Sequence, residues 1–146
     1  MKTEVTQKIT AHADDVWATI AKGGDVHRWF EDVIVACDLR GHGEGAERLC
    51  TMANGADLRE RILEINHDMR RFRYAIEKHP LPATDVVTTI TVVGLGQGGA
   101  EVTWSAEYSV DPAHETTVDD ALKAIYAQGI QSLETYHTVA SQGDQR

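Results

Sequence analysis

Acidic and phenolic side chains in the middle of the chain could take part in acid–base chemistry. Glu60, Tyr74 and Tyr108 each lie in a stretch where apolar and polar residues alternate. A carboxylate can act as a general base and a phenol can donate a proton, so these three residues are the catalytic candidates if the protein is an enzyme. Such chemistry needs a cavity that binds and orients a substrate. The surrounding elements must therefore form one.

Other kinds of chemistry receive no support from the sequence. None of the seven histidines is paired at His-x-x-x-His spacing, so we expect no metal site. The glycine-rich run 94–99 is not followed by a helix that could bind phosphate at its N-terminus, and we expect a hairpin loop there. The two cysteines, Cys37 and Cys50, cannot form a disulfide framework or a four-cysteine zinc site, and we expect two buried apolar thiols. We predict no cofactor.

The composition excludes several classes of partner. The 146 residues are 42% hydrophobic and 25% charged, and their net charge is -9. An acidic surface repels nucleic acid and anionic membranes, so we expect neither as a partner. No apolar run has the length of a signal peptide or a membrane span, and we predict a cytoplasmic protein without stable membrane insertion. We expect one domain over 1–146, with 142–146 as a frayed tail, and the sequence gives no signal for the oligomeric state.

Hydrophobic periodicity predicts an α+β fold. Residues 2–11 alternate and form a first strand, and two short helices follow, one beginning near Asp14 and one carrying Trp29 and Phe30. A long final helix covers 117–140, with apolar residues at helical spacing. Short turns between the remaining strands predict antiparallel neighbours, so we expect one seven-stranded curved sheet around the long helix. The six further strands are predicted at 33–40, 46–53, 57–66, 70–78, 85–94 and 100–110.

The strand faces indicate an apolar cavity. Trp104 and Tyr108 share one face of 100–110, and Tyr74 lies on the apolar face of 70–78. Trp29 and Phe30 would approach from the second helix. Aromatic rings with polar tips suit a ligand cavity that has a few orienting groups, although the same residues would also suit a filled core.

The strand at 57–66 leaves its inward face open, because both of its faces are mixed. If Arg59 and Arg61 face solvent, Glu60 and Ile62 point inward. A buried carboxylate without a partner is costly, so Glu60 would then need an arginine, a tyrosine or water beside it. The strand at 85–94 has the same ambiguity.

A glycine interrupts the apolar stripe of the final helix. Gly129 lies between Ile125 and Leu133 at helical spacing. Glycine inside a helix costs about 1 kcal/mol relative to alanine. Gly129 could allow a close approach of the helix to the sheet or to a ligand. The simpler alternative, which we favour, is that it serves ordinary helix–sheet packing.

Several segments together resemble one known family. They include Asp15-Val16-Trp17, Arg28-Trp29-Phe30, the run 55–65 with its Arg-Glu-Arg-aliphatic strand, Pro80-Leu81-Pro82, Val102–Ser105 and Ile125–Leu133. The chain resembles the bacterial polyketide cyclase/dehydrase and lipid-transport family, of the SRPBCC superfamily, over residues 3–140. The resemblance implies a START-like, helix-grip fold with a deep apolar cavity between sheet and helix. Many relatives have a tyrosine in the cavity at a position that is Val86 here.

This resemblance implies a hydrophobic ligand. We predict binding of a polyketide, a lipid or an isoprenoid-like molecule between the sheet and the C-terminal helix. The alternatives are a polyketide cyclase/aromatase or dehydratase, with Glu60 as the base and Tyr74 or Tyr108 as the donor, and a module that binds a protein segment. Whether a reaction is catalysed stays open. The expected ligand-binding residues are Trp29, Phe30, Glu60, Ile62, Tyr74, Trp104, Tyr108, Ile125, Gly129 and Leu133.

Overall fold

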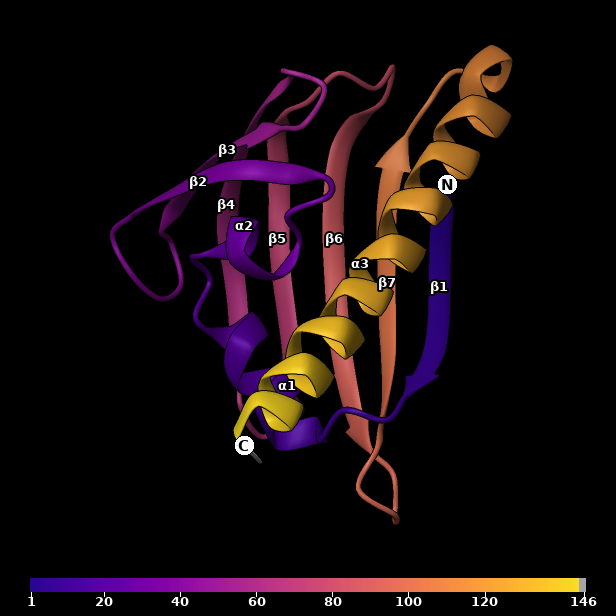
Figure 1. Ribbon diagram of the computed structural model, residues 1–146. Coiled ribbons are helices and arrows are strands. Elements are labelled where there is room, and N and C mark those ends of the chain that lie inside the picture. Colours follow the sequence, from indigo (N-terminus) through magenta and orange to yellow (C-terminus); the bar gives the residue numbers. More distant parts are fainter. Residues whose placement is uncertain (145–146) are drawn as a thin grey trace.

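One antiparallel sheet and one long helix dominate the structure (Figure 1). It is a computed structural model that describes the backbone of residues 1–144 and the side chains of residues 1–138. The strands are β1 (Lys2–Ile9), β2 (Ile34–Arg40), β3 (Glu47–Met52), β4 (Asp57–Asn66), β5 (Arg71–Lys78), β6 (Thr84–Gly94) and β7 (Ala100–Ser109). The helices are α1 (Ala13–Ala21), α2 (Val26–Trp29), a short 3-10 turn η1 (Pro112–His114) and α3 (Glu115–Asp144).

The seven strands form a single sheet in the order β1-β7-β6-β5-β4-β3-β2, and every neighbouring pair is antiparallel. The chain reaches this order because β1 pairs with β7, while β2 to β7 follow one another through short connections. Helix α3 crosses one face of the sheet diagonally, and α1 and α2 lie on the same side (Figure 1). The predicted helix-grip fold is confirmed.

Helix α3 is longer than the sequence pattern indicated. It begins at Glu115, two residues before the predicted start, directly after η1, and it continues to Asp144 rather than 140. The predicted tail at 142–146 is therefore helical up to residue 144, and residues 145–146 lie outside the described part. None of the described helices is apolar over a length that could cross a bilayer.

The expectation of two free thiols is wrong, because Cys37 and Cys50 form a disulfide. These residues are opposite each other in the register of β2 and β3, with their Cα atoms 4.1 Å apart. Each cysteine was assigned correctly to a strand, but only the pairing of the two strands reveals that they meet. Disulfides are rare in reducing compartments, and the cytoplasmic location stays a prediction.

Gly129 lets α3 approach the sheet at Trp104. A Cβ atom at residue 129 would overlap the six-membered ring of the Trp104 indole. The same indole stacks on Tyr126, one turn earlier in α3, with ring centroids 5.2 Å apart and planes at 12°. The glycine therefore serves the close helix–sheet contact, and the side chain it accommodates is Trp104.

We predict that Gly129→Ala destabilises the protein, although alanine is the better helix former. The gain in helix propensity is about 1 kcal/mol, whereas overpacking a filled core costs about 1 to 3 kcal/mol. Trp104 is held between other rings and cannot move away without cost. Urea unfolding measures the difference, and Gln128→Ala, on the exposed side of the same turn, is the control.

Adding Trp104→Phe to Gly129→Ala removes the atoms that clash, so the double variant should recover part of the loss. A Gly129→Ala variant that is more stable than the wild type by the full gain in helix propensity, about 1 kcal/mol, would contradict the close contact.

Candidate ligand cavity

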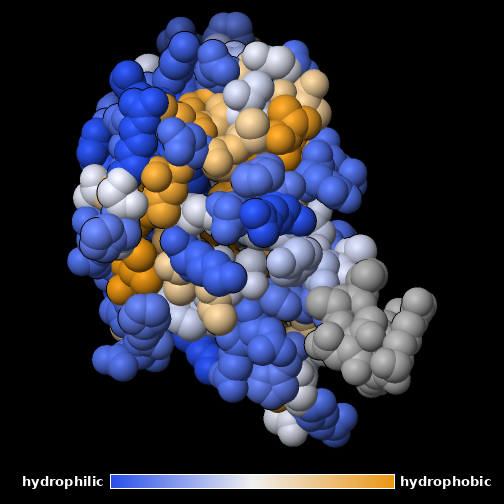
Figure 2. All heavy atoms as spheres, turned by 60° about the vertical axis from the view of Figure 1, so that its left-hand side comes forward, coloured by the Kyte–Doolittle hydropathy of each residue, from blue (hydrophilic) through white to orange (hydrophobic). Residues whose placement is uncertain are grey.

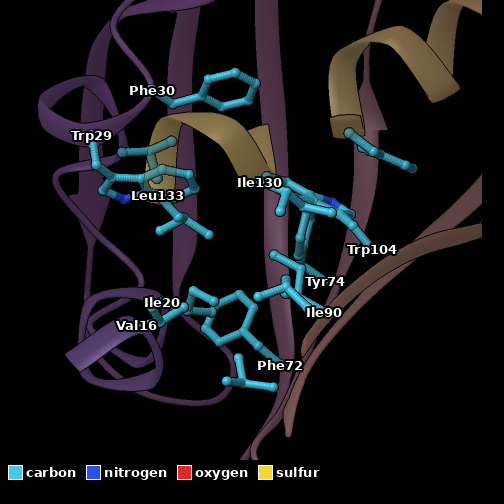
Figure 3. Close-up of a cluster of buried hydrophobic side chains, with 14 of the residues drawn as sticks. Val16, Ile20, Trp29, Phe30, Phe72, Tyr74, Ile90, Trp104, Ile130 and Leu133 are labelled. Atoms are coloured by element: carbon cyan, nitrogen blue, oxygen red, sulfur yellow. The ribbon is translucent and has the colours of Figure 1, made fainter. Parts of the chain in front are cut away.

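A cavity of about 290 Å³ lies between the sheet, α2 and α3. This is close to the lower end of the range for small-molecule sites, about 300 to 1,000 Å³. Figure 3 shows the buried side chains in and beside this region, which come from α1, from α2 and the residue after it, from the sheet and from α3. Most lining residues are apolar, and they include Ile20, Val26, Trp29, Phe30, Val33, Ile34, Cys50, Met52, Leu58, Phe72, Ile76, Leu81, Val86, Ile90, Trp104, Leu122 and Ile125.

The outer surface around the cavity is mixed in character. Figure 2 views the molecule from the side that carries β2, β3 and α2, and it shows hydrophobic residues between hydrophilic ones. Val33, Met52 and Leu58, which come from this side, are only partly buried and also line the cavity. Their incomplete burial indicates that the cavity lies close to this surface.

An aromatic cluster forms one wall of the cavity. The rings of Trp29 and Phe30 stack with centroids 5.6 Å apart, and Trp104 lies 6.1 Å from Trp29 and 5.9 Å from Phe30. Offset and tilted ring pairs at these distances are favourable. The indole N–H groups of Trp29 and Trp104 are buried and have no hydrogen-bond partner among the described residues.

A buried ion pair is the main polar feature of the cavity. Arg48 and Glu60 are opposite each other on β3 and β4, and each is 6% exposed. Arg48 Nε donates to Glu60 Oε1 at 2.7 Å, and Arg48 Nη1 donates to the carbonyl oxygen of Gly23 at 2.8 Å. The guanidinium also lies over the ring of Tyr74, 4.8 Å from its centroid. Glu60 therefore faces inward, and the partner that its burial requires is Arg48.

Burial raises the pKa of the Tyr74 phenol, and the nearby Glu60 carboxylate raises it further. The positive charge of Arg48 opposes this rise in the pKa, and the Trp104 N–H and the Thr88 hydroxyl oppose it to a smaller extent. The Tyr74 phenol is therefore protonated at neutral pH. It can donate a hydrogen bond, but its raised pKa makes it a weaker acid than a free phenol.

A second phenol, that of Tyr126 on α3, belongs to the same wall. Its hydroxyl lies 2.9 Å from Thr88 Oγ1 on β6, and its ring stacks on Trp104. Burial raises the pKa of Tyr126, and Tyr74 adds to this effect. The periodicity of the last helix gives no reason to include Tyr126 in the site, and its place in the cavity wall is known only from the structure.

Six of the predicted ligand-binding residues line the cavity, and four do not. Those that line it are Trp29, Phe30, Glu60, Tyr74, Trp104 and Ile125. Ile62, Gly129 and Leu133 are buried in the core beside it, packed against neighbouring side chains. Tyr108 is buried as well, but its hydroxyl lies 2.7 Å from Thr3 Oγ1, which donates in turn to Asp119 on α3.

Sequence reasoning missed Arg48, which is the most important omission. Arg48 lies in a predicted strand, between Glu47 and Leu49. Strict alternation places its side chain on the opposite face of the sheet from those of its two neighbours. The sequence indicated only that a buried Glu60 would need an arginine, a tyrosine or water beside it. Only the register of β3 against β4 identifies Arg48, since Glu47 pairs with Arg61 on the outer face and Arg48 pairs with Glu60 on the inner one.

The family model for polyketide cyclase/dehydrase and lipid transport matches residues 1–138. The chain belongs to this family. A search of curated proteins finds no match to its sequence.

Solved structures of other proteins have folds similar to that of this chain. An uncharacterised protein from Bacillus thuringiensis is 22% identical, with a TM-score of 0.84 over 94% of this chain and 99% of the other. Norcoclaurine synthase from Thalictrum flavum, in complex with dopamine and hydroxybenzaldehyde, is 18% identical, with a TM-score of 0.77 over 92% and 84%. The ginseng major latex-like protein 151, from Panax ginseng, is 17% identical, with a TM-score of 0.82 over 94% and 97%. At these identities the likeness shows the fold.

We predict that Arg48→Met destabilises this family member by about 3 to 5 kcal/mol, because it leaves the Glu60 carboxylate buried and unpaired. The double variant Arg48→Met with Glu60→Met removes both charges and should be close to the wild type in stability, since apolar residues often replace a buried pair without loss. Chemical denaturation of the four members of this mutant cycle gives the coupling energy.

The matched control is Arg61→Met. Arg61 pairs with Glu47 at 3.5 Å on the same two strands, but on the exposed face. Its loss should cost about 1 kcal/mol or less. If Arg48→Met and Arg61→Met lowered the free energy of unfolding equally, the inner pair would not be buried.

Proposed function

We propose that the protein binds a hydrophobic small molecule, such as a polyketide, a lipid or an isoprenoid-like compound, in the cavity between the sheet and α3. The observation that carries the proposal is the cavity itself, which is enclosed mainly by aromatic and aliphatic side chains. Burial of apolar ligand surface in such a site is worth about 25 cal/mol per Å². The family and its fold support a ligand-binding protein.

The alternative of acid–base catalysis on a polyketide has weaker support. Glu60 Oε1 accepts a hydrogen bond from Arg48 Nε, so only Oε2 is left to interact with a substrate. Of the two phenols proposed as donors, Tyr74 lines the cavity, whereas Tyr108 is bonded to Thr3 outside it. Binding requires only the apolar walls, which are present. The third alternative, a groove for a protein segment, fits an enclosed cavity less well than an open cleft.

Native mass spectrometry of the protein purified from the organism that encodes it tests the proposal. We expect a bound small molecule that is released on denaturation. Ile125→Trp should abolish or strongly reduce this bound mass, because Ile125 is half-buried on α3 and a larger side chain there would occupy the cavity.

The control is Leu63→Trp, an equally large addition at a partly exposed position of β4 that does not line the cavity. It should retain the bound mass. Retention of the ligand by Ile125→Trp, or its loss from both variants, would contradict binding in this cavity. Turnover of the released compound by the wild type, lost in Glu60→Gln with binding intact, would favour the enzyme.

A further inference from the structure

The Arg48–Glu60 pair places two opposite charges in a mainly apolar cavity. Both residues line the cavity, and they neutralise each other. An ionised group that enters this space loses its hydration, and the cavity supplies no net charge to compensate for it. The pair therefore disfavours a carboxylate or a phosphate at the polar end of the ligand.

The same pair retains capacity for hydrogen bonds. A guanidinium has five N–H groups, and the bonds to Glu60 and Gly23 use two of them. Glu60 Oε2 accepts no hydrogen bond from the described residues, and the described part of the chain offers no further acceptor to Arg48. A donor and an acceptor thus lie next to each other at one point of the cavity wall.

The lining has further polar side chains at Thr19, Asn54, Tyr74 and His79. Among these, the ring of Tyr74 lies against the Arg48 guanidinium, and its phenol is a hydrogen-bond donor. The unpartnered indole N–H groups of Trp29 and Trp104 are fully buried and do not open into the cavity.

We propose that Arg48 and Glu60 form a subsite for an uncharged polar group that carries an acceptor oxygen beside a hydrogen-bond donor. A carboxamide, an enol next to a carbonyl, and a β-hydroxy carbonyl have this arrangement. The oxygen accepts from the free N–H groups of Arg48, and the donor bonds to Glu60. The ligand class is thereby narrowed to neutral oxygenated compounds, and free fatty acids and phospholipid head groups are excluded from this subsite. This inference rests on the proposed function.

Three naphthalene probes of similar shape test the subsite: naphthalene-2-carboxamide, naphthalene-2-carboxylate and 2-isopropylnaphthalene. Their dissociation constants are measured by isothermal titration calorimetry at pH 7.5, where the carboxylate is ionised. We expect the wild type to bind the carboxamide at least tenfold more tightly than the carboxylate. Equal binding of the two, or preference for the carboxylate, would overturn the subsite.

Glu60→Gln should shift this preference towards the carboxylate by at least tenfold, because Arg48 then has an uncompensated positive charge. If this variant does not fold, the double variant Arg48→Met with Glu60→Met tests the subsite through a different pair of probes. In it, binding of the carboxamide relative to 2-isopropylnaphthalene should fall at least tenfold. An unchanged ratio would overturn the subsite.

The matched control is Glu47→Gln, which changes the neighbouring pair on the outer face and should leave all three affinities unchanged. The two proposals fail differently. If the wild type binds none of the probes and native mass spectrometry finds no bound small molecule, the ligand-binding function and the subsite both fall. If it binds 2-isopropylnaphthalene but does not discriminate between the polar probes, ligand binding stands and the subsite alone is refuted.

Discussion

The width of the sheet, compared with that of a single helix, determines the internal organisation of this molecule. Seven strands at about 4.8 Å spacing span about 29 Å, whereas a helix with its side chains is about 10 to 12 Å across. Helix α3 therefore covers only part of the apolar face, and its backbone lies closest to β1 and β7. The short helices α1 and α2 cover more of the face, and the space left above β3 to β6 is the cavity.

The close contact between α3 and Trp104 establishes the boundary between filled core and cavity. Gly129 brings the helix down onto the indole, and Tyr126 packs against the same ring. Trp104 thus contributes to both regions, since it also approaches Trp29 and Phe30 on the cavity side. Its two roles, which the sequence presented as alternatives, are compatible because an indole is large enough to have a different neighbour on each side.

Local patterns predict the architecture well because alternation and short turns allow few arrangements of antiparallel strands. They leave the inward face of β4 open and place Glu60 inside only on the condition that Arg59 and Arg61 face solvent. They fail for Arg48 and for the cysteine pair, because each depends on the register between two strands. Tyr108 shows a second limit. It shares a sheet face with Trp104, as predicted, but that face is divided between the part under α3 and the part that opens into the cavity, and periodicity does not distinguish them.

The disulfide between β2 and β3 has a consequence for the way in which the sheet can open. Strand β2 is at the edge, where a strand ordinarily separates first because it has only one neighbour. The covalent bond fastens it to β3 at Cys50, a residue of the cavity wall. Closing this short loop restricts the unfolded chain and is worth about 3 kcal/mol in the oxidised protein. Local opening is therefore less favourable at the β2 edge of the sheet. It is expected instead in the segments across from this edge, which are held by non-covalent contacts alone.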